Sequence, residues 1–518
     1  MANKGLFRSL MGALIPQADV RNAEGAPAYA MTPEGALAQY AATGCLNASF
    51  YYATAEDQLQ RVLDLCAGVE PECIARTAIF ARERGFMKDM PALLCAVLSV
   101  RSPALFAKVF PRVIDSGRML RTFVQVIRSG AVGRKSLGSL PKRMVRAWLE
   151  GRDDAAVFRA SVGRDPSLGD IVKMVHPRPS MRSREALYGW LIGRPHDAEA
   201  LAPVVREFEA FKGGAWESLP DVPFEMLTAL DLGTREWAAI AEKAPWHMTR
   251  MNLNTFARHG VFAVPGMGRR IAERLRDPEA IGRARVFPYQ ILAAWAAADD
   301  AVPAEIREAL QDALEIALRN VPSVGGKVYV CPDVSGSMRS PVTGARGTAT
   351  TKMRCVDVAA LVAAALVRKN PGTEVIPFEE KVVDVRLNPR DSVLTNAEKL
   401  AAVGGGGTCV SAPLRLLNGR GARGDLVVFV SDNQSWVDAG AGRGTATLAE
   451  WNRFKARSPD ARMVLIDLQP DGTTQARDRE DILNVGGFSD QVFDVIATFA
   501  AGRLSARHWA GVIEAVEL

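Results

Sequence analysis

The spacing of apolar residues changes near residue 326, and this change limits what the chain can fold into more than any other feature. Up to about residue 320, apolar residues recur every three or four positions, the spacing of one face of an amphipathic helix. After the Pro- and Gly-rich stretch 320–326, short runs of β-branched and aromatic residues alternate with helical segments. Such alternation is typical of a doubly wound α/β domain. The sequence therefore predicts a helical module over residues 1–325 and an α/β domain over residues 326–518.

The helical module is predicted to consist of short α-helices stacked in antiparallel pairs, as in HEAT repeats. Prolines stand at or near the first turns of several segments, where the missing backbone N–H costs little. The best-defined helices are predicted at residues 55–68, 71–85, 90–101, 103–115 and 119–130. In the α/β domain, strands are predicted at residues 327–332, 373–378, 381–387, 426–431 and 463–468.

Two of the predicted strands end in oxygen-bearing side chains. The strand at 327–332 leads into Asp-Val-Ser-Gly-Ser at 333–337, and the strand at 426–431 leads into Asp432, with four glycines and Thr408 between them. Each piece alone also occurs in ordinary turns, loops and helix caps. Together, at the carboxyl edge of a parallel sheet, where open α/β domains gather ligands, they predict a metal site formed by Asp333, Ser335, Ser337, Thr408 and Asp432. Carboxylates combined with hydroxyls suit Mg²⁺ or another hard divalent cation.

Composition is that of a globular chain with enough apolar residues for a large core. The 518 residues are 48% apolar and 24% charged. No apolar run approaches the roughly 20 residues that span a bilayer, and the N-terminus has no hydrophobic signal region. The seven cysteines are scattered and form no CxxC pair, which argues against a disulfide framework or a structural zinc site. We expect a cytoplasmic protein with no membrane partner.

Positive charge is concentrated between residues 112 and 194. This stretch holds 17 basic residues against 7 acidic ones, a surplus larger than the net charge of +6 of the whole chain. A solvated helix surface would show mixed signs, whereas the first half of this stretch is almost entirely basic. A cationic surface of this size usually has a polyanion as partner, and nucleic acid is favoured over a membrane because no aromatic-rich amphipathic helix accompanies it. Charge and placement select Lys142, Arg143, Arg146 and Lys173 as RNA-binding candidates.

Five stretches of the chain resemble one known family, in order and spacing. They are residues 141–148 (Pro-Lys-Arg-Met-Val-Arg-Ala-Trp), 170–177 (Asp-Ile-Val-Lys-Met-Val-His-Pro), 284–293 (Ala-Arg-Val-Phe-Pro-Tyr-Gln-Ile-Leu-Ala), 333–338 (Asp-Val-Ser-Gly-Ser-Met) and 432–436 (Asp-Asn-Gln-Ser-Trp). The chain resembles the Ro 60 kDa autoantigen and its bacterial orthologues. In this family a TROVE module precedes a von Willebrand factor A (VWA) domain with a metal-ion-dependent adhesion site (MIDAS).

The resemblance implies a ring of HEAT-like helical repeats closed by the VWA domain. It implies that a Y-like small noncoding RNA binds the basic outer surface and that single-stranded 3′ ends of misfolded RNA enter the central hole, in RNA quality control. The family's RNA-contacting histidine corresponds to His176 and one basic position to Arg159, while a second basic position falls at Gly163, next to Arg164. An exoribonuclease such as polynucleotide phosphorylase is the partner that the resemblance adds.

Three classes of function can be weighed against these features. The leading one is a noncatalytic RNA-binding scaffold of a Ro ribonucleoprotein. The alternative is a metal-dependent protein-adhesion adaptor that recruits an effector through the VWA domain. Enzymatic activity is not expected, because metal-dependent nucleases and phosphatases gather several carboxylates around one or two ions, and only Asp333 and Asp432 are predicted to converge here. In the resembling family an acid follows the metal-site threonine, whereas Cys409 follows Thr408 in this chain.

Overall fold

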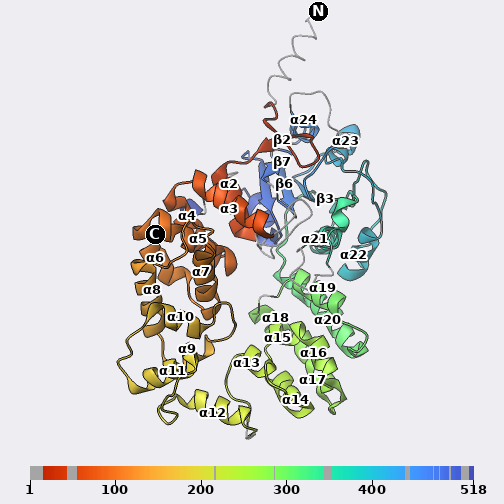
Figure 1. Cartoon of the computed structure of the whole chain (residues 1–518). Helices are drawn as coiled ribbons and strands as arrows, with labels where there is room; N and C mark the ends of the chain where they lie inside the picture. The colour runs from red at the N-terminus through yellow and green to blue at the C-terminus, as the bar shows by residue number, and fades with distance from the viewer. Residues whose placement is uncertain are drawn as a thin grey trace, which may run out of the picture. The chain divides into compact units, whose positions relative to one another are not determined.

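The computed structural model describes residues 16–43, 55–214, 218–284, 286–342, 353–437, 444–470, 472–477, 479–488, 492–502, 511 and 513–518 (Figure 1). The chain divides into two compact units. The first comprises residues 1–61, 245–257 and 265–511, and the second comprises residues 62–244, 258–264 and 512–518. The predicted domain boundary at residue 325 separates two sequence patterns and stays a prediction. The last helices before it belong to the same compact unit as the α/β domain.

The second unit is built from helices, as the apolar spacing predicts. Its elements are α3 (Ala55–Gly68, whose first residues belong to the first unit), α4 (Pro71–Glu83), α5 (Asp89–Arg101), α6 (Pro103–Val113), α7 (Gly117–Ser129), α8 (Ser139–Glu150), α9 (Asp154–Arg159), α10 (Leu168–Val175), α11 (Arg182–Ile192), α12 (Pro203–Lys212), α13 (Phe224–Thr228), α14 (Thr234–Lys243) and the 3-10 turn η1 (Val261–Ala263). The five best-defined predicted helices are confirmed as α3 to α7, and no end differs from the prediction by more than two residues.

Local chemistry explains where these helices begin and end. The Ser116 side chain accepts a hydrogen bond from the Met119 N–H (3.4 Å) at the start of α7, and Gly130 ends the same helix in the left-handed conformation, with φ +87°. The apolar face of α7 then packs on α6 through three phenylalanines. Phe123 stacks on Phe106 with ring centroids 5.7 Å apart and meets Phe110 edge to face at 5.2 Å. All three rings are buried, so this cluster anchors one helix pair of the unit.

The first unit contains the remaining helices and the sheets. Before the α/β domain it holds α2 (Pro33–Thr43), α15 (Trp246–Met251), α16 (Leu253–Arg258), α17 (Met267–Arg276), α18 (Pro278–Arg283), α19 (Pro288–Ala297), α20 (Ala304–Ala317) and η2 (Leu318–Asn320). The α/β domain follows with β3 (Val328–Pro332), η3 (Ser337–Arg339), α21 (Cys355–Lys369), β4 (Glu374–Val375), α22 (Val393–Ala401), α23 (Ala412–Gly419), β5 (Leu426–Ser431), α24 (Ala446–Lys455), β6 (Arg462–Asp467), β7 (Thr473–Thr474), β8 (Ile482–Gly486) and α25 (Val492–Ala500).

The central sheet of the α/β domain has five parallel strands in the order β4-β3-β5-β6-β8. Strand β3 therefore lies between the next strand in the chain, β4, and the strand after that, β5, so the strand order reverses direction at the β3/β5 boundary. In doubly wound sheets, ligands bind outside the carboxyl ends of the strands at this point. The predicted fold class is confirmed.

Helices cover both faces of this sheet. One face carries a buried cluster in which Cys331 of β3 and Phe429 of β5 pack with Leu414 of α23 and with Trp451 and Phe454 of α24. Helix α21 has no residue in that cluster and packs against β3, β4, β5 and α22. Both faces are buried, which is why β3 and β5 are continuous apolar runs and not alternating ones.

A β-hairpin near the N-terminus belongs to the α/β domain, which the helical pattern before residue 320 did not predict. Strands β1 (Val20–Arg21) and β2 (Pro27–Ala30) pair antiparallel, and β2 pairs with β7, so that Tyr29 lies opposite Thr474. Figure 1 shows β2 beside β7. Tyr29 is fully buried in the core cluster of the α/β domain, and its hydroxyl donates to the Pro16 carbonyl oxygen (2.8 Å). The hairpin is therefore fixed to the α/β domain by apolar packing as well as by backbone hydrogen bonds.

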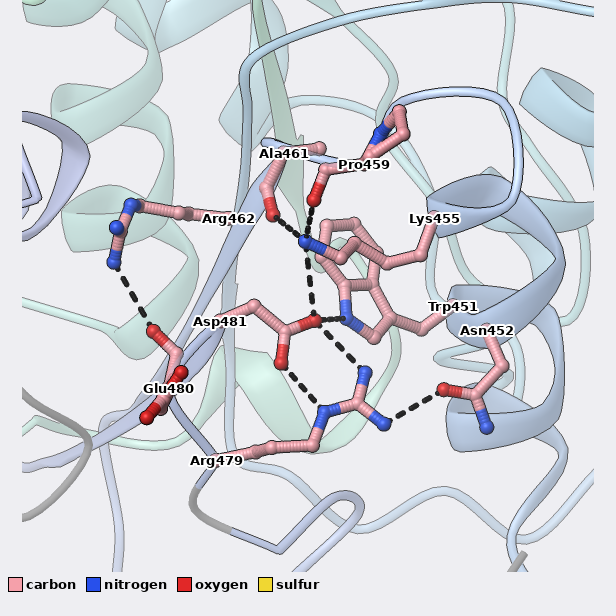
Figure 2. A network of polar contacts seen from close by, with 9 residues as sticks. All are labelled: Trp451, Asn452, Lys455, Pro459, Ala461, Arg462, Arg479, Glu480 and Asp481. Carbon is pink, nitrogen blue, oxygen red and sulfur yellow. Dashed lines mark hydrogen bonds and ion pairs between the residues drawn. The ribbon is translucent and has the colours of Figure 1, made fainter. Parts of the chain in front are cut away.

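The amino edge of the sheet is held by a polar network around Asp481, which precedes β8 (Figure 2). The Asp481 carboxylate accepts hydrogen bonds from Trp451 Nε1 (2.8 Å) and from Arg479 Nε (2.5 Å), and Lys455 Nζ lies 3.7 Å away. Burial by itself would raise the pKa of Asp481, but these donors and charges lower it. The network therefore ties β8 to α24 at the edge of the sheet opposite the predicted metal site.

Two details of the α/β domain differ from the prediction. Residues 381–387 do not form a strand and make only an isolated bridge between Phe378 and Val382, so that prediction is wrong. The fifth strand is instead β8, whose short sequence Ile-Leu-Asn-Val-Gly carries a polar residue in its middle and gave no clear strand pattern. Within the described residues, no helix combines the length and the apolar character needed to cross a bilayer.

Candidate metal centre and basic surface

The predicted metal-site aspartates lie at the point where the strand order reverses. Asp333 directly follows β3, and Asp432 directly follows β5. These two strands are parallel neighbours in register, with Pro332 opposite Val430. The parallel register therefore brings both carboxylates to the same edge of the sheet, although 98 residues separate Asp333 from Ser431 in the chain.

Hydrogen bonds orient the Asp333 carboxylate. Its Oδ1 accepts the backbone N–H of Ser335 (2.8 Å), and its Oδ2 accepts the hydroxyl of Ser431 (2.5 Å). The hydroxyl oxygens of Ser335 and Ser337 lie 3.3 Å apart. Asp333, Ser335 and Asp432 are almost completely buried, whereas Ser337 is partly exposed. The structure thus brings four of the five predicted ligands to one place, with Ser337 at the solvent side.

The glycine loop brings the fifth residue, Thr408, to this place. Gly336 N–H donates to the Gly406 carbonyl oxygen (2.9 Å), and the Thr408 carbonyl oxygen accepts the Trp436 N–H (3.1 Å). Gly404 has φ +82°, and a side-chain Cβ there would lie 2.2 Å from the Val334 carbonyl oxygen. Only glycine allows this approach. A pocket of about 430 Å³ opens over the set, and its lining includes Ser337, Thr408 and Trp436.

Acidic side chains also stand beside the glycine loop, although none follows Thr408 in the chain. Glu379 Oε2 accepts the Gly406 N–H (2.8 Å), and Glu380 Oε1 accepts the Gly407 N–H (3.3 Å). Both glutamates belong to the segment after β4, and the prediction did not include them. Two carboxylates therefore lie beside the glycine loop, next to Thr408 in the chain's fold. Only the tertiary structure brings residues 379 and 380 to the loop.

The burial and mutual repulsion of the Asp333 and Asp432 carboxylates favour a bound cation. Burial, together with the negative charge of Asp432, raises the pKa of Asp333 from 3.8 to about 7. The hydrogen-bond donors to Asp333 are neutral groups, so they do not cancel its charge. A divalent cation would remove both the repulsion and the desolvation cost. Among the described residues, no three His, Cys, Asp or Glu side chains gather as a metal-binding cluster, so an ion held here relies on the hydroxyls as well.

Part of the positive charge between residues 112 and 194 is paired with acids of the second unit. Arg112 binds Glu83 (2.9 Å), Arg118 lies 3.2 Å from Asp89, Arg159 binds Asp221 (2.6 Å), and Arg184 is buried against Asp154. Three of these four acids, Glu83, Asp89 and Asp221, lie outside residues 112–194. The surplus within that stretch therefore overstates the free positive charge.

The remaining cations form a smaller set. Their side chains make no hydrogen bond or salt bridge with another residue that the structure describes: Arg128, Lys135, Lys142, Arg143, Arg164, Lys173, Arg178 and Arg194. Four of these are predicted RNA-binding residues, and all four have partly or fully exposed side chains. Lys142 and Arg143 lie on α8, Arg164 lies in the loop after α9, and Lys173 lies on α10, while the other members of the set lie on α7 or in the segments after α7, α10 and α11. Helix α8 packs against α10.

Two predicted residues of this surface have structural partners. Arg146 Nε donates to the carbonyl oxygen of Val175, the last residue of α10, and therefore helps to attach α8 to α10. Arg159 binds both the carboxylate and the carbonyl oxygen of Asp221. His176 caps α10 in the left-handed conformation, with φ +48°, and its side chain is exposed. His176 is therefore placed on the same surface as Lys173.

Arg121 is a cation of this surface that the sequence did not single out. It comes from α7, and its Nη1 lies 1.5 Å from where a Cβ on Gly163 would be. Gly163 is the position at which the resembling family has a basic residue, so a guanidinium from another helix fills the space of the missing side chain. Burial lowers the pKa of Arg121, which remains a cation at neutral pH. Comparing sequences position by position cannot detect that a residue from another helix fills this space.

Comparisons with known proteins agree with this geometry. Residues 327–500 match the family described as Ro60 vWA domain. RNA-binding protein RO60 of Deinococcus radiodurans is 24% identical over 554 residues, which cover 97% of this chain and 100% of that protein. The crystal structure of the Deinococcus radiodurans RO (RSR) protein matches with a TM-score of 0.65 at 21% identity, covering 91% of this chain and 100% of that one. The chain is therefore similar over nearly its whole length to RNA-binding protein RO60 of Deinococcus radiodurans, and residues 327–500 match the Ro60 vWA domain family.

Proposed function

We propose that this protein is a noncatalytic RNA-binding scaffold of a Ro ribonucleoprotein. The observation that carries the proposal is the set of cations on α8 and α10 that have no acidic partner. Unpaired Lys and Arg side chains bind phosphates and release counterions without having to break existing salt bridges. The likeness to a protein named RNA-binding protein RO60 supports the same class of ligand.

The RNA proposed for this surface is a structured, Y-like small noncoding RNA. A-form stems are recognised through their backbone and shape, which suits a surface of Lys and Arg more than a set of base-reading side chains. The exposed His176, beside Lys173, is a ring on which an unpaired base can stack. The family resemblance adds that single-stranded 3′ ends of misfolded RNA enter a central hole, in RNA quality control, with an exoribonuclease such as polynucleotide phosphorylase as partner.

The test compares two charge reversals of equal size. Lys142→Glu/Arg143→Glu changes two cations that have no acidic partner on α8, and Lys88→Glu/Lys243→Glu changes two exposed lysines elsewhere in the same unit. Arg146 is left unchanged because it joins α8 to α10. Mobility shift at fixed salt, with the structured RNA that copurifies with the protein, should show affinity lower by about tenfold or more for the α8 pair alone. Equal affinities of the two variants would show that α8 is not the RNA site.

For the VWA domain we propose a divalent cation, Mg²⁺ by preference, held by Asp333, Ser335, Ser337, Thr408 and Asp432. Such an ion neutralises the two buried carboxylates and offers an open coordination position. A second proposed function, recruitment of an effector protein through this position, is favoured by the rim of the pocket. Trp436 is 45% exposed, unusual for a tryptophan, and Val437 beside it is 40% exposed.

The two functions are separable by experiment. Asp333→Ala removes a metal ligand in the first unit and leaves the cations of α8 and α10 untouched. We expect Asp333→Ala to retain RNA affinity and to lose a protein partner in pull-downs. The parent protein should bind this partner without EDTA and lose it when EDTA is added. Loss of RNA affinity in Asp333→Ala would show that the metal site and the RNA surface do not act separately.

A further inference from the structure

The tip of the N-terminal hairpin lies on the loop that follows Asp432. Asn22 Nδ2 donates to the Ser435 carbonyl oxygen (2.9 Å), and the Ala23 N–H donates to Gln434 Oε1 (3.0 Å). Asn22 is buried, and its Oδ1 also accepts the N–H groups of Glu24 (3.1 Å) and of Ala26 (2.9 Å). The tip therefore has a fixed backbone and a fixed position relative to the metal-site loop.

The anchoring of the hairpin continues away from its tip. Tyr29 is fully buried in the core of the α/β domain, and β2 pairs with β7. The hairpin is thus attached to the α/β domain both at its tip and along β2. The backbone of the residue at the tip, Glu24, therefore has a defined position.

Glu24 is part of the wall of the metal-site pocket. The pocket of about 430 Å³ is lined by Glu24 together with Gly336, Ser337, Gly406, Gly407, Thr408, Gln434 and Trp436. The Glu24 side chain is exposed, and its carboxylate makes no hydrogen bond or salt bridge with any residue in the described part of the chain. In this structure the carboxylate lies at the wall and not beside the two aspartates, since no three metal-ligating side chains gather there among the residues that the structure describes.

A free carboxylate on a fixed backbone at this place has a physical consequence. Glutamate has rotatable bonds between its backbone and its carboxylate, so the side chain can turn into the pocket while the turn of residues 22–26 stays in place. A hard divalent cation bound by two carboxylates and hydroxyls accepts a further carboxylate oxygen. The backbone turn is already ordered by Asn22, so little conformational entropy is lost when Glu24 binds.

We propose that Glu24 is a ligand of the metal site supplied by the chain itself, directly or through one water molecule. It takes the coordination position that an acidic side chain of another protein would otherwise occupy. An acidic partner must then displace Glu24, so the hairpin sets how readily the VWA domain accepts external carboxylates. This inference rests on the divalent cation site of the proposed function.

The experiment uses the full-length chain, with Mn²⁺ as the probe and acetate as the smallest external carboxylate. Mn²⁺ affinity is measured by electron paramagnetic resonance, and acetate binding to the Mn²⁺-loaded protein by water-proton relaxation. Glu24→Gln removes the charge, and Glu24→Asp keeps the charge but shortens the side chain. Glu34→Gln, an exposed glutamate in α2 of the same N-terminal segment, is the matched control.

We expect Mn²⁺ affinity to fall about tenfold in Glu24→Gln and by a similar factor in Glu24→Asp, with no change in Glu34→Gln. Acetate should bind the two Glu24 variants more tightly than the parent protein. If Glu24→Asp keeps the parent affinity for Mn²⁺, Glu24 acts only through its charge and the inference is overturned. If neither variant gains acetate binding, Glu24 does not occupy the position open to external carboxylates and the inference is overturned as well. If the parent protein binds no Mn²⁺, the metal site itself fails and the inference fails with it.

Discussion

Asp333→Asn tests whether the carboxyl edge of the VWA sheet is built for a cation. Asp333 is completely buried, and burial together with Asp432 raises its pKa from 3.8 to about 7. Asparagine has nearly the same shape, and its amide can still accept the Ser335 N–H that now reaches Oδ1 at 2.8 Å. The substitution therefore removes a charge while it preserves most of the packing.

The sign of the effect follows from the direction of the shift. Because the pKa of Asp333 is higher in the folded than in the unfolded protein, the folded state holds an extra proton between about pH 4 and pH 7. Without a metal, the free energy of unfolding of the parent protein therefore falls as pH rises through this range. The full difference of about three pKa units corresponds to at most about 4 kcal/mol above pH 7.

The assay is urea unfolding in EDTA, followed by circular dichroism between pH 4.5 and pH 8. We expect Asp333→Asn to match the parent protein at the acidic end and to be more stable by up to about 4 kcal/mol at pH 8. For a domain of this size, that upper limit corresponds to a Tm higher by about 8–16 °C. Added Mg²⁺ should stabilise the parent protein and leave the variant unchanged. Asp460→Asn, which changes an exposed carboxylate of the same domain, should show no pH-dependent difference. A stability difference that is the same at every pH, or a variant less stable than the parent at pH 8 in EDTA, would refute the reasoning.

Three further outcomes follow from single contacts. Gly404→Ala should destabilise the VWA domain by about 2 kcal/mol or more, because a Cβ would lie 2.2 Å from the Val334 carbonyl oxygen at a φ of +82°. In the control Gly419→Ala the added Cβ meets no atom within 4 Å, so the denaturant midpoint should change little. Arg184→Ala should cost about 3–5 kcal/mol, since it leaves the mostly buried carboxylate of Asp154 without its partner and frees the carbonyl oxygen of Leu149, which Arg184 now binds at 2.7 Å. The same denaturant series measures this loss, and a destabilisation below about 1 kcal/mol would contradict the prediction. Lys142→Glu/Arg143→Glu should also reduce the slope of log affinity against log salt by about 0.7–0.9 for each RNA phosphate that the variant no longer neutralises, and an unchanged slope would mean that neither side chain binds a phosphate.

The pattern of residues along the chain was sufficient for the layout of the fold. The apolar spacing located helices α3 to α7, and the apolar runs at 327–332 and 426–431 located β3 and β5, because both patterns are local. Two strands were misjudged where the local pattern is weak. Residues 381–387 contain apolar residues but make only an isolated bridge, and β8 carries a polar residue inside a short buried strand.

The convergence of Asp333 and Asp432 was predictable because strand ends are predictable. A carboxylate directly after each of two neighbouring parallel strands must come to the same sheet edge. Their partners were not predictable, because Glu379, Glu380 and Glu24 come from segments that local sequence does not connect to the site. The same limit applies to the basic surface, where Arg121 fills the space beside Gly163 from another helix.

The sequence by itself determined how many basic residues lie between 112 and 194, and the tertiary structure decided which of them remain free to bind RNA. Charges add along the chain, but salt bridges depend on which acids approach in space. Glu83, Asp89 and Asp221 neutralise three arginines of this stretch from outside it. In the same way, the sequence identified Asp333 and Asp432 as candidate ligands, while the burial that raises the pKa of Asp333 and the position of the hairpin beside the Asp432 loop follow from the tertiary structure.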